Sequence, residues 1–150
     1  MIRSLASGLF ALALTAFLAS AAAAGGPVNK TLFGNAIDGY DPAAYHLDGM
    51  PVEGSKNFTY EWMGATWRFA NMDNRDLFAA DPAKYAPAFG GYCAYGVAKG
   101  NKVGFDPMAW KIVEGRLYLN LNANIQKKWQ KDIPGFIAMA EQKWPKLKDK

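Results

Sequence analysis

Residues 57–71 read NFTYEWMGATWRFAN. On each side of Met63-Gly64, aromatic residues alternate with polar ones, which is the period of a β-strand that buries one face. This pattern predicts a two-stranded antiparallel hairpin. Its buried face is expected to carry the aromatic side chains Phe58, Tyr60, Trp62, Trp67 and Phe69.

The segments on either side of this hairpin carry the start signals of short helices. Asp41 precedes Pro42, the order in which an N-cap side chain and a first-turn proline occur. After the hairpin, Asn71 stands where a second helix can begin, and that helix is expected to run to Ala80, before Asp81-Pro82.

The second half of the chain predicts another hairpin and a helical end. Glu114-Gly115 separates two short apolar runs, as in a two-residue hairpin turn. From Ile125 to Trp144 the apolar residues recur at helical spacing, and Asp132-Ile133-Pro134 marks a restart, so two consecutive helices are expected. Residues 92–98 fit either a short helix or a buried strand. The predicted fold is therefore α+β, with small antiparallel hairpins, short helices and a C-terminal helical pair.

The first residues look like an export signal. Residues 1–24 contain one charged residue, Arg3, followed by an apolar stretch and an alanine-rich end. We therefore expect residues 1–24 to be a signal peptide, 25–34 a flexible N-terminal segment and 35–150 one domain with a C-terminal helical extension. An uncleaved membrane anchor is the alternative. No cysteine or arginine pair marks a lipoprotein or twin-arginine signal, so Sec-type export to the periplasm is expected, leaving no transmembrane span after cleavage.

The positive charge is confined to the end of the chain. The formal net charge is +4, yet residues 25–126 hold nine basic and ten acidic side chains. Residues 127–150 hold seven lysines and three acidic residues. We interpret this tail as a solvated helix face. No nucleic-acid partner is expected, because no nucleic-acid-binding motif accompanies the lysines, and export argues against ATP- or NAD-dependent chemistry.

Several short runs together resemble a known family. They are DGYDPAAY at 38–45, NRDLF at 74–78, GGYCA at 90–94 and KDIPG at 131–135. Their order is similar to that of secreted YHS-domain proteins of proteobacteria, over about residues 35–144. The resemblance implies a core similar to the treble clef. In copper-transporting ATPases and mercury-handling proteins, such domains bind soft metals through cysteines.

This chain departs from those metal-binding relatives at the ligand positions. Where they have cysteine after Asp-Pro, the chain has residues 43–46, AAYH, and where they have cysteine after the aromatic strand, it has Ala70 and Asn71. The inherited thiolate site is therefore absent. A structural zinc site needs four ligands, which one cysteine and one histidine cannot supply.

Cys93, the one cysteine, allows two interpretations. A lone cysteine is often a small buried hydrophobic residue. In an oxidising compartment, however, a free thiol is unusual, and a helix beginning just after it would lower its pKa. On the second interpretation Cys93 is a redox-active thiol.

The same thiol is also a candidate metal ligand. His46 is the one histidine and lies in the stretch that is functional in cysteine-bearing relatives. Thiolate and imidazole together favour copper(I) and similar soft ions. Cys93 and His46 are therefore the candidate ligands, and Tyr45, Tyr92 or Met108 are weaker candidates to complete the shell.

These observations predict a periplasmic YHS-domain binding protein for copper or another soft metal ion. Two alternatives stay open: a thiol-based redox protein that uses Cys93, and a protein-interaction module without metal, whose partner is a periplasmic protein. No enzyme is expected, because the chain has no Gly-x-Ser-x-Gly, His-Glu-x-x-His or phosphate-loop motif. Copper is the one candidate cofactor.

Overall fold

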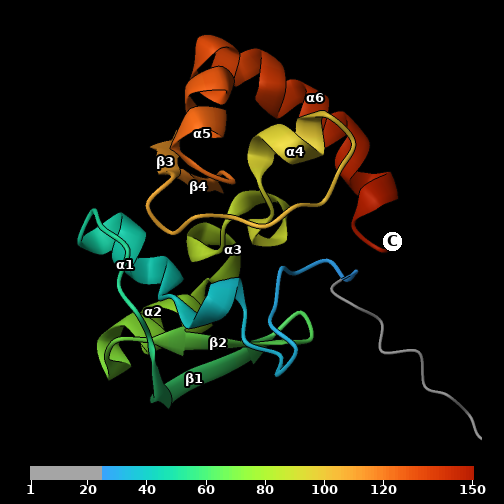
Figure 1. Cartoon of the computed structure of the whole chain (residues 1–150). Helices are drawn as coiled ribbons and strands as arrows, with labels where there is room; N and C mark the ends of the chain where they lie inside the picture. Colours follow the sequence, from blue (N-terminus) through green and yellow to red (C-terminus); the bar gives the residue numbers. More distant parts are fainter. Residues whose placement is uncertain (1–24) are drawn as a thin grey trace, which may run out of the picture.

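The computed structural model describes residues 25–150, so the predicted signal peptide lies outside the described residues. The architecture is α+β, as predicted, with two separate two-stranded antiparallel sheets and helices around them (Figure 1). The strands are β1 (Ser55–Trp62), β2 (Ala65–Phe69), β3 (Trp110–Val113) and β4 (Arg116–Leu119). The α-helices are α1 (Pro42–Leu47), α2 (Met72–Ala80), α3 (Pro82–Tyr85), α4 (Ala94–Ala98), α5 (Ala123–Trp129) and α6 (Ile133–Leu147). Short 3-10 helices are η1 (Ile37–Gly39), η2 (Ala88–Gly91) and η3 (Gln130–Asp132).

The predicted aromatic hairpin is confirmed as β1–β2. Met63 and Gly64 both have positive φ, 51° and 70°, which is the turn geometry that matches the twist of two-residue hairpins. Trp67 and Phe69 are fully buried on β2. Their ring centroids each lie 5.1 Å from that of Phe78 on α2, so the hairpin and α2 share one aromatic core.

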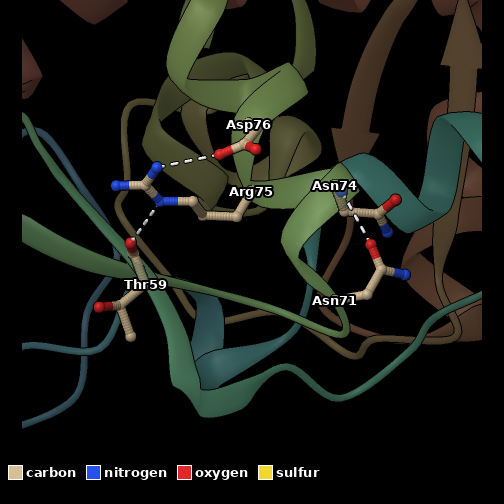
Figure 2. Close-up of polar contacts among 5 residues, drawn as sticks. All are labelled: Thr59, Asn71, Asn74, Arg75 and Asp76. Atoms are coloured by element: carbon tan, nitrogen blue, oxygen red, sulfur yellow. Dashed lines mark hydrogen bonds and ion pairs between the residues drawn. The ribbon is translucent and has the colours of Figure 1, made fainter.

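Polar contacts hold α2 in its place beside β1 (Figure 2). Asn71 caps the helix, as predicted, by accepting a hydrogen bond of 2.8 Å from the Asn74 backbone N–H. Arg75 Nε donates to the Thr59 carbonyl at 3.0 Å, and Arg75 also pairs with Asp76 at 3.0 Å. These contacts tie the start of α2 to the middle of β1.

Asp41 connects three elements through one buried carboxylate. Its Oδ1 accepts hydrogen bonds from the backbone of Ala43 and Ala44, at 2.8 and 3.2 Å, and so caps α1 as predicted. Its Oδ2 accepts from the Ala70 N–H at 2.9 Å and from Asn74 Nδ2 at 2.8 Å. A buried carboxylate is costly unless its oxygens are hydrogen-bonded, and here both oxygens are.

The second half forms its own core around α4 and α6. Residues 92–98, for which helix and strand were both open, contain the helix α4, which packs against α6. The C-terminal helix was expected to end at Trp144, before Pro145. In the structure α6 continues to Leu147, so Pro145 lies inside the helix. Alternate side chains of β4 join the two cores: Leu117 and Leu119 face the aromatic core, and Tyr118 faces Trp129 and the C-terminal helices.

Residues 25–34, expected to be flexible, pack against the body of the protein. Val28 is only 2% exposed, and the Asn29 N–H donates to the Gly90 carbonyl at 2.8 Å. Gly90 is required at this contact, since its φ is +62° and a Cβ would lie 1.8 Å from the Pro27 carbonyl oxygen. The segment therefore contributes to the tertiary structure, although its loop at Leu32 and Phe33 is exposed.

In residues 25–150, no helix is long and apolar enough to cross a membrane.

Candidate functional site

Cys93 lies at the N-cap of α4 and is only 1% exposed. Its sulfur accepts a hydrogen bond from the Gly96 N–H at 3.4 Å, and its thiol donates to Asn120 Oδ1 at 3.6 Å. Burial raises the pKa of the Cys93 thiol, and this effect exceeds the lowering by nearby backbone N–H groups. The predicted position at a helix start is present, but desolvation reverses the expected effect on the pKa.

Asn120, which sequence reasoning did not single out, is the buried partner of this thiol. Its Oδ1 also accepts a hydrogen bond from the Tyr95 N–H at 3.2 Å. Its Nδ2 is buried without a hydrogen-bond partner. The arrangement explains the lone cysteine structurally, since the thiol caps α4 and links it to the residue after β4. Only the tertiary structure could reveal this pair, because 27 positions separate the two residues.

His46 lies in a different environment, in the last turn of α1 against α3. Its Nε2 is 3.3 Å from the Tyr85 carbonyl oxygen, and the two rings meet edge to face with centroids 5.5 Å apart. Burial, together with the positive charge of Lys84, lowers the pKa of His46 below its ordinary value. The imidazole is therefore neutral at pH 7, which is the form that binds metals.

The weaker candidate ligands have other partners. The Tyr45 hydroxyl donates to the Pro107 carbonyl at 3.0 Å, and the Tyr92 hydroxyl donates to the Gly26 carbonyl at 3.1 Å. Burial raises the pKa of both phenols, so both are protonated at neutral pH. Met108 is largely exposed.

No group of three or more His, Cys, Asp or Glu side chains in the described part of the chain is placed to hold a metal ion. Ala43 and Ala44, which follow Asp41-Pro42, are fully buried, and their backbone N–H groups donate to the Asp41 carboxylate. A shared site of Cys93 and His46 stays a prediction.

A cavity of about 250 Å³ lies where the two halves of the molecule meet. The turn end of β1–β2, α3, residues 27–28, β4 and the end of α6 all contribute to its wall. Figure 1 shows these segments converging from distant parts of the sequence, with the end of α6 near the start of the described chain. The aromatic part of the wall consists of Trp62, Trp67, Phe89 and Trp144.

The cavity combines buried and accessible walls. Trp62 and Trp144 are partly exposed and present ring surface to solvent, whereas Trp67 and Phe89 are buried behind the wall. Arg116 and Lys148 also line the cavity. An apolar concave surface with a few polar groups is the usual form of a small-molecule site. No sequence motif marks it, because its residues span positions 27–148 and meet only through tertiary packing.

Comparison with known proteins identifies one domain. The family model described as the YHS domain matches residues 43–89, which run from α1 through the β1–β2 hairpin, α2 and α3 into η2. No curated protein and no solved structure matches the chain. The cavity lies at the border of the matched region. Of the residues that line it, Trp62, Trp67 and Phe89 belong to residues 43–89, whereas Arg116 and Trp144 do not.

Proposed function

We propose that this chain is a non-enzymatic binding protein that holds a small apolar ligand in the cavity beside its YHS domain, residues 43–89. The observation that carries the proposal is the aromatic cavity itself, with about 250 Å³ of space between the YHS domain and the end of α6. Ligand sites are typically concave and lined mainly by apolar and aromatic side chains with a few polar groups, and this cavity has that composition.

The dimensions of the cavity set the class of ligand. Small-molecule pockets commonly measure roughly 300–1,000 Å³, so this cavity suits a compact molecule of about a dozen non-hydrogen atoms. At about 0.3–0.7 kcal/mol per non-hydrogen atom, a ligand of this size gains about 4–8 kcal/mol on binding, which corresponds to a Kd of about 1 mM to 1 µM.

A filled-cavity variant tests the proposal. Ala83 is exposed on α3 and lines the cavity, so Ala83→Trp is expected to occupy the space without disturbing a buried core. With 2-naphthamide as an uncharged aromatic probe in isothermal titration calorimetry, we expect binding by the unaltered protein and at least a tenfold loss in Ala83→Trp.

The matched control is Ala80→Trp, which adds the same side chain at an exposed position on α2 outside this cavity. Ala80→Trp should bind the probe like the unaltered protein. Equal binding by both variants would show that the probe binds elsewhere and would contradict the proposal.

The soft-metal and redox predictions remain as the alternatives. Both functions need access to the Cys93 sulfur, which is buried and hydrogen-bonded. The burial of this thiol therefore favours ligand binding in the cavity over metal binding or redox chemistry at Cys93. A copper(I) competition titration tests the soft-metal prediction. If Cys93 and His46 share a copper site, Cys93→Ser and His46→Ala should each bind copper(I) more weakly, and unchanged affinity in both variants would exclude that site.

An interaction module without metal is favoured by one observation. Leu32 and Phe33 are adjacent in a surface loop and are 88% and 89% exposed. Large apolar side chains presented together on a surface often mark a contact site for another protein. Chemical cross-linking in periplasmic extract should then trap a partner that the double variant Leu32→Ser, Phe33→Ser fails to trap.

A further inference from the structure

We infer that the ligand of this cavity is a small amphipathic monocarboxylate, an aromatic or short aliphatic group that carries one acid. This inference rests on the proposed binding function and adds the charge of the ligand. Arg116 and Lys148 both line the cavity, whereas no aspartate or glutamate does. The wall therefore combines aromatic surface with positive charge, which complements an apolar molecule with one negative group.

The two cations come from different parts of the fold and lack acidic partners. Arg116 begins β4 directly after the Glu114-Gly115 turn, and Lys148 follows the last residue of α6. Among residues 25–150, the one ion pair is that of Arg75 and Asp76. Neither cavity cation is thus neutralised by a carboxylate of the described chain, and both charges remain available to a ligand.

Lys102 removes an electrostatic obstacle at the same end of the molecule. The backbone carbonyls at the end of a helix carry partial negative charge and would repel an anion. Lys102 Nζ donates to the carbonyl oxygen of Lys148, the C-cap of α6, at 3.3 Å and to a backbone oxygen of the last residue, Lys150, at 2.5 Å. These carbonyls are therefore already bonded to a cation, and Lys148 can direct its own charge to a ligand.

The chemistry of the two side chains favours a carboxylate. A guanidinium group presents parallel N–H donors that match the two oxygens of a carboxylate, and a lysine ammonium adds a point charge. Arg116 and Lys148 are both exposed residues at the cavity, so their attraction for a carboxylate is expected to weaken as salt rises. The volume of about 250 Å³ leaves room for a compact aromatic group, up to two fused rings, with one acid group.

A matched pair of probes tests the inference on the purified protein. 2-Naphthoate and 2-naphthamide have nearly the same shape and differ in charge. In calorimetric titrations at low salt we expect the acid to bind about tenfold more tightly than the amide, with the difference shrinking as salt rises. Arg116→Gln and Lys148→Gln should each reduce the preference for the acid over the amide. Lys128→Gln, at an exposed position of α5 outside the cavity, should leave this preference unchanged.

The outcomes separate the ligand class from the binding function. Equal affinity of acid and amide, or a preference that survives both cavity substitutions, would overturn the carboxylate inference and leave the binding function standing. If the unaltered protein binds neither probe, both proposals fail. Arg116→Gln changes a strand residue, so the melting temperature of this variant is first compared with that of the unaltered protein. Should Arg116→Gln not fold, Lys148→Gln and the salt titration provide an independent test.

Discussion

Cys93 shows how the surroundings of one residue set its chemistry. The sulfur stands at a helix N-terminus, where backbone N–H groups favour the thiolate, yet burial against Asn120 raises the pKa of the thiol. The same is true of His46, whose pKa is lowered because burial disfavours the charged ring. For Cys93 desolvation outweighs the backbone N–H groups at the helix start, and for His46 it outweighs the hydrogen bond to the Tyr85 carbonyl.

We predict that the Cys93 thiol is unreactive in the folded protein. Because its pKa is raised, the reactive thiolate fraction at about pH 8 is smaller than for a free cysteine, and burial also blocks the reagent. Titration with a disulfide reagent should be at least about tenfold slower in buffer than after unfolding in urea. Rapid modification of the folded protein would contradict this assignment and return the redox function to first place.

At the scale of elements, the β1–β2 hairpin is held by aromatic burial on α2. Trp67 is fully buried with its Nε1 donating to the Trp62 carbonyl at 3.0 Å, and its ring packs on Phe78. Trp62 belongs to the same hairpin but is only partly buried. The difference in exposure between two indoles on neighbouring strands allows the contribution of burial to be measured.

We predict that Trp67→Ala lowers the free energy of unfolding by about 3–5 kcal/mol, because it removes a large side chain from a core that cannot refill the space. Trp62→Ala removes the same indole from a partly exposed position and should cost clearly less. Urea unfolding monitored by circular dichroism compares the two variants. If both lost the same stability, or if Trp67→Ala had no effect, the described burial of the hairpin would be wrong.

At the scale of the whole molecule, both ends of the described chain meet at one side chain. Lys102 donates to backbone oxygens of Gly25 and Gly26 on one side and of Lys148 and Lys150 on the other. The Tyr92 hydroxyl adds a hydrogen bond to Gly26. The first described residues are therefore part of the tertiary structure and border the cavity through Pro27 and Val28.

We propose that export removes the leader and leaves this docked segment intact. The apolar stretch with its alanine-rich end predicts that the exported chain begins between Ala22 and Gly26. N-terminal sequencing or intact-mass measurement of the periplasmic fraction checks the start site. Recovery of a chain beginning at Met1 from the membrane pellet would contradict it and favour the uncleaved anchor.

Local patterns in the sequence were sufficient for most of the elements. Alternating aromatic residues predicted β1–β2, Glu114-Gly115 predicted β3–β4, and Asp41 and Asn71 were recognisable as caps. These features depend on neighbours within a few positions, so hydrophobic period and hydrogen-bonding capacity are enough to infer them. The YHS domain was recognisable from short runs as well, of which NRDLF at 74–78 lies within the matched residues 43–89, whereas GGYCA and KDIPG lie outside them.

The candidate site and the state of Cys93 depended on contacts between distant residues. The cavity brings together Val28, Trp62, Arg116 and Trp144, and the Cys93 thiol has a raised pKa because tertiary packing buries it. No local pattern encodes these contacts, because they arise from packing of whole elements. Burial, and with it the free energy of a charge or an aromatic ring, is a property of that packing, and only the tertiary structure could decide it.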